Sequence, residues 1–174
     1  MAATYNGSVA NLVDPLSNSP LSSPSHSGQH TEINDALQAL GVWQAWTPTF
    51  TTTGTAPAIG NGTMIGRYTV FNKTVIAQFF FSAGSTTTFG TGTLLFSLPV
   101  NSSSTVNAFS ALGSGFVIDE SAQNSYVCNV DRKNTADKFG LRFTGGTFAD
   151  VTGTAPFTMA NTDTIRAQLV YEAA

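Results

Sequence analysis

The amino-acid sequence changes character at Gly41, and this break limits what the chain can fold into. Before it, Ser, Asn and the prolines Pro15, Pro20 and Pro24 interrupt every helical or strand-like period. After it, Thr, Phe and Gly alternate as in strands and turns. The first kind of segment cannot bury enough apolar surface to fold alone, whereas about 130 residues of the second kind make one normal domain. The sequence therefore predicts a single folded domain with an appendage.

Residues 1–30 are expected to form an extended docking arm that becomes ordered on a partner or on a sister subunit. The arm carries isolated apolar residues, and a purely solvating linker has little reason to contain them. A tail that makes no contacts is the alternative. The residues that we expect to anchor the arm are Leu12, Val13, Leu16 and Leu21.

One short helix is predicted over residues 31–41. Thr31 is a suitable N-cap, Asp35 lies in the first turn, where the helix dipole favours an acid, and Gly41 occupies the stop position. A helix this short is marginal in water, so its apolar stripe must be buried, either on the β domain of the same chain or where three copies meet around an axis. The stripe consists of Ile33, Leu37 and Leu40.

Residues 42–174 are predicted to form an all-β head, a jelly-roll-like antiparallel β-sandwich. Runs rich in β-branched and aromatic residues are separated by Gly-led turn clusters at the spacing expected for a sandwich. Phe71-Asn72-Lys73-Thr74 is expected to be a tight hairpin turn. The eight expected strands cover residues 46–51, 63–71, 73–82, 93–98, 106–119, 124–132, 138–144 and 163–172.

Alternation along the strands predicts which side chains face the core. The odd positions from Val75 to Phe81 are one such set, and those from Ile165 to Tyr171 are another. On the other face of 73–82, Ile76 and Phe80 are also apolar, which predicts that arm, loops or another subunit covers them. The remaining core is expected to consist of Val106, Leu112, Phe116 and Ile118 on one strand and of Phe139, Leu141 and Phe143 on another.

Composition and charge exclude several classes of function. Only 10% of the residues are charged and the net charge is −3, with the basic residues scattered singly, so a nucleic-acid partner is not expected. The sequence contains no apolar run long enough to cross a membrane, and its start lacks the pattern of a signal peptide. We therefore expect neither membrane insertion nor secretion by a signal peptide.

No group of residues in the sequence indicates an enzyme, a cofactor site or a metal site. The single Cys128 alternates with Tyr126 and Val130 and is expected to be a buried thiol. His26 and His30 lie four apart but lack an acidic or thiol companion, so metal binding is not expected. Asp119-Glu120 and the charge-dense stretch from Asp131 to Lys138 are both expected to be solvated turns.

One resemblance to a known family is visible. The stretch PLSSPSHSGQHTEINDA, residues 20–36, resembles the amino-terminal segment of virion proteins of tailed bacteriophages, especially those of actinobacterial hosts. The segments WTPTF (46–50), GTMIGRY (62–68), GSTTTFG (84–90) and FSLP (96–99) are similar to the β module that follows it in such proteins. The amino-terminal match is the more specific of the two, because Gly/Thr patterns recur by composition alone.

The resemblance implies a virion structural protein, either a minor tail or tail-fibre-like protein or a capsid-decoration protein, assembled as a homotrimer. Its partners would be itself and other virion proteins of the capsid or tail, with the arm and helix attaching the subunit and the β domain forming an outward head. The chain lacks the repeated shaft of long fibres, which favours a compact knob. The alternative is a module that recognises a host surface or glycan through aromatic and amide side chains on its loops.

Overall fold

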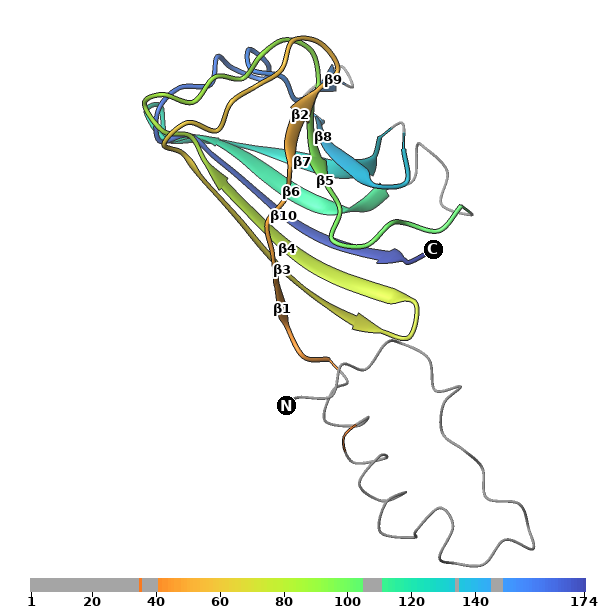
Figure 1. Ribbon diagram of the computed structural model, residues 1–174. Coiled ribbons are helices and arrows are strands. Elements are labelled where there is room, and N and C mark those ends of the chain that lie inside the picture. The colour runs from red at the N-terminus through yellow and green to blue at the C-terminus, as the bar shows by residue number, and fades with distance from the viewer. Residues whose placement is uncertain (1–34, 36–40, 105–110, 134, 145–148) are drawn as a thin grey trace, which may run out of the picture.

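The computed structural model describes residue 35 and residues 41–104, 111–133, 135–144 and 149–174. These residues form one ten-stranded antiparallel sheet with the order β1-β3-β4-β10-β6-β7-β8-β5-β2, and β9 pairs with β8 outside that path (Figure 1). The predicted all-β antiparallel fold is confirmed. The strands are β1 (Gln44–Trp46), β2 (Phe50–Thr52), β3 (Thr63–Phe71), β4 (Thr74–Ser82), β5 (Leu94–Ser97), β6 (Ala111–Asp119), β7 (Asn124–Arg132), β8 (Lys138–Phe143), β9 (Ala149–Asp150) and β10 (Thr164–Glu172).

The sheet is curled, and its two edge strands are close neighbours in the sequence. The edges are β1 and β2, which only residues 47–49 separate, so the single strand predicted over 46–51 is wrong. Pro48 has no N–H to give to a ladder, and the chain crosses there from one edge to the other. Thr49 continues the second edge, because its N–H donates to Ser97 Oγ at 2.9 Å.

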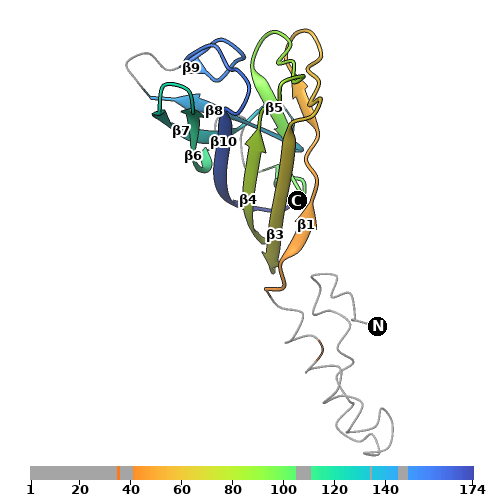
Figure 2. The same cartoon turned by 90° about the vertical axis from the view of Figure 1, so that its left-hand side faces the viewer.

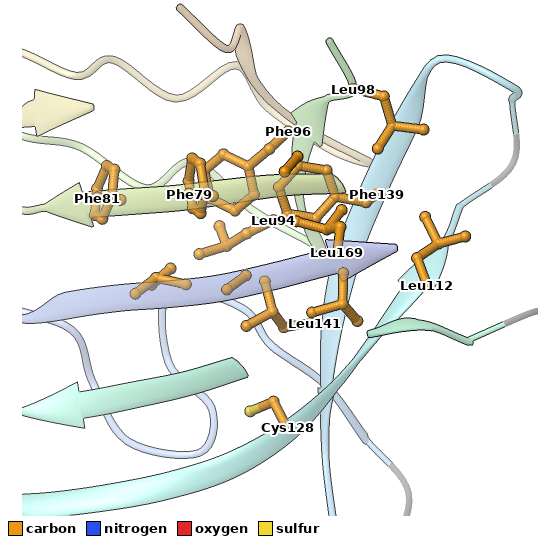
Figure 3. Packing of buried hydrophobic residues seen from close by; sticks show 14 of the residues in the cluster. Phe79, Phe81, Leu94, Phe96, Leu98, Leu112, Cys128, Phe139, Leu141 and Leu169 are labelled. Carbon is orange, nitrogen blue, oxygen red and sulfur yellow. The ribbon is translucent and has the colours of Figure 1, made fainter. Parts of the chain in front are cut away.

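Aromatic rings fill the space that the curled sheet encloses (Figure 3). Phe79 of β4 faces Phe96 of β5 at 4.6 Å and Phe139 of β8 at 5.3 Å between ring centroids, so opposite parts of the sheet meet as the layers of a sandwich do. The predicted core faces of β4 and β10 are confirmed. Their buried members are Val75, Ala77, Phe79 and Phe81, with Ile165, Ala167, Leu169 and Tyr171.

The core prediction for β6 is only partly right, because a β-bulge changes the phase of that strand. The register against β7 shifts between Ala111 and Gly113, and Leu112 is buried there as predicted. Beyond the shift, Val117 is buried whereas Phe116 is 45% exposed. One extra residue in a strand moves the side chains that follow it to the opposite face. Phe116 therefore lies on the outer face of the sheet.

Most of residues 1–41 lie outside the described part of the chain. This applies to the whole predicted arm, 1–30, and to the predicted helix 31–41 except for two residues. Asp35 is helical and exposed. Gly41 has a φ of +76°, the left-handed conformation expected of a helix stop.

The head has two different ends (Figure 1). Gln44 of β1 pairs with Tyr68 of β3, and the antiparallel direction brings the residues before Gln44 toward the turn after Phe71. That turn is the predicted tight hairpin, with Asn72 at a φ of 54°. The loops 53–62, 83–93 and 152–163 gather at the other end, where β3 begins and β4 ends.

Threonine and asparagine side chains hold the loops at that far end in place. Asn61 Oδ1 accepts from the N–H of Thr86 at 2.9 Å, and Thr87 Oγ1 donates to the carbonyl of Ile59 at 2.6 Å. These bonds join segments that are distant in sequence through neutral groups. A chain with few charges thus fixes its loops with hydroxyls and amides.

Candidate functional site

Two rows of side chains cross the outer face of β3, β4, β10 and β6, the face turned away from the core. Figure 2 shows these four strands side by side. In the first row, Phe80 of β4 is paired with Ile65 of β3 and with Arg166 of β10. Arg166 is in turn opposite Phe116 of β6. We call Ile65, Phe80, Arg166 and Phe116 the Phe80 row.

The second row lies two residues further along each strand. Gln78 is paired with Arg67 and with Gln168, and Gln168 is opposite Ser114. We call Arg67, Gln78, Gln168 and Ser114 the Gln78 row. Because neighbouring side chains on one face are two residues apart, about 7 Å separates the two rows.

A hollow of about 590 Å³ lies between the rows, and we call it the trench. Its floor is formed by the residues between the rows, which are Gly66, Phe79, Ala167 and Gly115. The side chains of Phe79 and Ala167 are buried in the core, so these positions present mainly backbone to the trench. The trench is therefore a sheet surface with raised side chains along both sides.

The two glycines of the floor are required by close packing from the core side. A Cβ on Gly66 would lie 2.2 Å from Cε3 of Trp46. A Cβ on Gly115 would lie 2.4 Å from the carbonyl oxygen of Arg166 on the neighbouring strand. Both approaches are closer than carbon atoms tolerate, so larger residues would force the sheet apart.

Arg67 is held over one end of the trench by two contacts. Its Nε donates to Gln78 Oε1 at 2.8 Å, and its guanidinium carbon lies 4.9 Å from the ring centroid of Trp43. The hydrogen bond orients the amide of Gln78 with its NH₂ group as the remaining donor. The Nη groups of Arg67 carry further N–H donors.

Arg166 stands in the middle of the Phe80 row. Its guanidinium carbon lies 5.8 Å from the ring centroid of Phe80, and its Nη2 is 3.8 Å from Glu120 Oε1. Both partners of that ion pair are largely exposed, so the pair adds little to stability. The apolar neighbours in the row are open to solvent too, since Ile65 is 58% exposed.

The trench thus combines a side that is apolar apart from Arg166 with a side rich in hydrogen-bond donors. Among the described residues that line it, both charged side chains are arginines. A ligand with one apolar face and one edge of acceptor or anionic groups matches that arrangement.

The structure places one residue of the predicted subunit interface in the trench. Phe80 lines it, whereas Ile76, two residues beyond Gln78 on the same face of β4, lies outside it. Both side chains are half-buried. The remaining predicted docking residues lie outside the described part of the chain, and they are Leu12, Val13, Leu16, Leu21, Ile33, Leu37 and Leu40.

The charge-dense stretch from Asp131 to Lys138 is not simply a solvated turn, because two of its members are buried in an ion-pair cluster. Asp131 is 5% exposed and Lys133 is 7% exposed. Lys133 Nζ binds Asp150 Oδ1 at 2.5 Å, and Arg142 reaches Asp131 at 3.4 Å and Asp150 at 3.2 Å. We call Asp131, Lys133, Arg142 and Asp150 the β7–β9 cluster.

The cluster balances two anions with two cations and joins three strands. Burial alone would raise the pKa of Asp150, but the hydrogen bonds and charges of Lys133 and Arg142 outweigh burial and hold that pKa below its usual value of 3.8. Each charge has partners of the opposite sign, which is the condition for burying ions at an acceptable cost. We assign the cluster a structural role.

The other acidic pair, Asp119-Glu120, forms an exposed turn as expected. Asp119 Oδ1 accepts from the Ser121 hydroxyl at 2.7 Å and from the Ala122 N–H at 2.9 Å. The hydrogen bond from the Ala122 N–H, followed by that from the Ser121 hydroxyl, lowers the pKa of Asp119. Both bonds are local and fix the shape of the turn.

Cys128 is a buried thiol, as predicted (Figure 3). Burial raises its pKa to about 11, so the thiolate that a nucleophile requires is scarce at neutral pH. The described residues contain no group of three or more His, Cys, Asp or Glu side chains that could hold a metal ion. His26 and His30 lie outside them. None of the helices described is long and apolar enough to cross a bilayer.

Sequence reasoning found Phe80 but missed the arginines and amides beside it. Arg67, Gln78 and Gln168 are scattered over more than 100 positions in the printed sequence, and only the register of β3, β4 and β10 assembles them. The one usable signal was that 73–82 is apolar on both faces. Comparison with known proteins adds no relative, since no family model, curated protein or solved structure matches this chain.

Proposed function

We propose that this chain is a structural protein of a tailed-bacteriophage virion, attached through residues 1–41 with residues 42–174 as an outward head. The observation that carries the proposal is that the two ends of the head differ. The chain enters beside the β3–β4 turn, and the loops gather at the opposite end. A subunit that is attached to the particle at the chain-entry end and exposes its loops at the other end would have such a shape. The resemblance of residues 20–36 supplies the class of partner.

In this proposal the arm and helix carry the assembly function. The spaced apolar residues of 1–30 dock on other virion proteins of the capsid or tail, and the helix stripe of 31–41 joins three copies. The head requires no cofactor and performs no catalytic step. The chain reaches the virion by assembly in the host cytoplasm.

Deleting residues 1–30 tests the assembly role. We expect the shortened chain to keep a folded β domain and to be missing from purified particles, as measured by protein gel and mass spectrometry of the particles. Circular dichroism of the purified variant provides the folding control. Incorporation at the level of the full-length chain would overturn the proposal.

The predicted trimer has a separate test in the mass of the purified chain. Light scattering should give three times the chain mass of 18.2 kDa. Replacing Leu37 and Leu40 with Asn should reduce that mass to one chain, because it removes the apolar stripe. Replacing Asn34 and Gln38 with Ala is the matched control, since both lie off the stripe. A single-chain mass for the unchanged protein would contradict the trimer.

A second candidate function is recognition of a host surface by the head. The trench favours it, because an open hollow with apolar, amide and guanidinium groups has the composition of a ligand site. The loops were the expected location for such contacts. The aromatic and amide groups of the trench lie instead on the sheet face.

A further inference from the structure

We propose that the trench binds a linear oligosaccharide that carries carboxylate groups. The inference rests on the second candidate function, recognition of a host surface, and adds to it a location and a class of ligand. Three properties of the trench carry it: its shape, the difference between its two sides, and its charge.

The shape of the trench favours a linear ligand. The Phe80 row and the Gln78 row run across β3, β4, β10 and β6, perpendicular to the strands, because each row consists of residues paired in register. Neighbouring strands lie about 4.8 Å apart, so the four strand axes span ~14 Å. A short linear chain of pyranose rings can lie along that length.

The two sides of the trench match the two kinds of surface on a sugar ring. The C–H face of a pyranose is apolar and packs against aromatic and aliphatic side chains, which Phe80, Phe116 and Ile65 supply. The hydroxyl edge needs hydrogen-bond partners, which Gln78 and Gln168 supply from the opposite row. An entirely apolar ligand would leave those amides without partners.

The charge of the trench selects an acidic saccharide. Arg67 and Arg166 line it, and no carboxylate is among the described residues that do so. The lining of the trench is therefore positively charged, although the chain as a whole carries a net charge of −3. Glu120, which pairs with Arg166, is not among the lining residues, and an acidic ligand would compete with its exposed carboxylate for the guanidinium. A uronic acid places its carboxylate at the ring edge, where a guanidinium can bind it through two hydrogen bonds without displacing the C–H face from the aromatic row.

The proposal is tested by calorimetric titration of the full-length chain with acidic hexasaccharides. The probes are oligogalacturonate, hyaluronan and alginate fragments, together with the methyl ester of oligogalacturonate. We expect at least one acidic fragment to bind. If oligogalacturonate binds, esterification should weaken it about tenfold or more, the loss expected for a charge-assisted hydrogen bond. Binding should also weaken with added salt.

The variant Arg166→Gln tests the location of the site. Its guanidinium makes an exposed ion pair with Glu120 and a surface contact with the Phe80 ring, both of which add little to stability. Its removal should therefore leave folding intact and lower the affinity about tenfold. The matched control is Lys73→Gln, which removes one positive charge from the exposed β3–β4 turn, outside the trench. Equal loss of affinity in both variants would show a diffuse charge effect and overturn the assigned site.

Other results would overturn the inference in favour of a different occupant. Failure of every acidic fragment to bind at about 1 mM excludes the ligand class. Tighter binding of a hexaglutamate peptide assigns the trench to an acidic peptide instead. A change of oligomeric mass in Phe116→Ser assigns the face to contact between copies. None of these measurements involves particles, so the inference can fail while the assembly proposal stands, and the reverse also holds.

Discussion

Asp163 shows what a single buried acid does in a chain with few charges. It is 1% exposed. Its Oδ1 accepts from the Glu120 N–H at 3.0 Å, and its Oδ2 accepts from the Ala160 N–H at 2.7 Å. One carboxylate thereby connects the turn after β6 to the turn before β10. Nothing in the local sequence marks this residue, because its partners lie on two different turns.

Replacing Asp163 with Ala should destabilise the head by about 1–3 kcal/mol, since two backbone N–H groups would lose their acceptor in a buried place. Urea unfolding followed by tryptophan fluorescence measures the loss. Asp119→Ala is the control, because that carboxylate makes similar bonds in an exposed turn, where water can replace it. Equal losses in the two variants would refute the burial argument.

At the scale of elements, the β7–β9 cluster predicts how stability depends on pH. The pKa of Asp150 is lower in the folded chain than its usual value of 3.8. Its contribution to stability is therefore complete above the unfolded pKa and is lost as the pH falls through the folded pKa. Asp150→Asn removes this contribution at every pH.

We therefore expect the free energy of unfolding of Asp150→Asn to lie below that of the unchanged chain at neutral pH. The difference should shrink as the pH falls below about 4. Urea titrations at a series of pH values measure it, and Asp137→Asn, outside the cluster, serves as the control. A difference that grows toward acid pH would mean that the sign of the Asp150 shift is wrong.

The closure of the sheet depends on the short edge strands β1 and β2. Trp46 at the end of β1 lies 6.2 Å from Phe79 and 6.3 Å from Phe139 between ring centroids, so it packs against both β4 and β8. Trp46→Ala should cost roughly 2–4 kcal/mol as the loss of a large core aromatic. Trp43→Ala should cost about 1 kcal/mol or less, because that ring mainly contacts Arg67 at the surface. Thermal unfolding compares the two, and a larger effect at Trp43 would disprove this account.

The strands β4 and β10 were predictable because each buries one complete alternating set of large apolar residues. The phase of β6 was not, because Gly113 and Gly115 provide no side chains from which to detect the bulge at Leu112. The trench and the β7–β9 cluster escaped prediction for another reason. Both depend on the register between strands, which for the trench are remote in sequence and for the cluster are consecutive, and local periodicity carries no information on register.

At the scale of the whole molecule, the boundary between arm and head predicts which part of the chain is needed for the head to fold. The first described backbone pairing of the head is that of Gln44 with Tyr68, only three residues after Gly41. The residues that complete the core at the sheet edge, Trp46 and Phe50, follow at once. A cut before β1 should therefore be tolerated, and a cut after it should not.

Two truncated chains test this boundary. A chain of residues 42–174 retains every described strand. It should therefore unfold in one cooperative step, with a thermal midpoint close to that of the full-length chain in which Leu37 and Leu40 are replaced with Asn. A chain of residues 48–174 loses β1 and Trp46, exposes the edge of β3 and removes the Trp46 ring that packs against Phe79 and Phe139. It should melt well below the longer chain or aggregate through the open edge. Equal midpoints for the two truncations would place the start of the head beyond β1 and would make β1 part of the attachment segment.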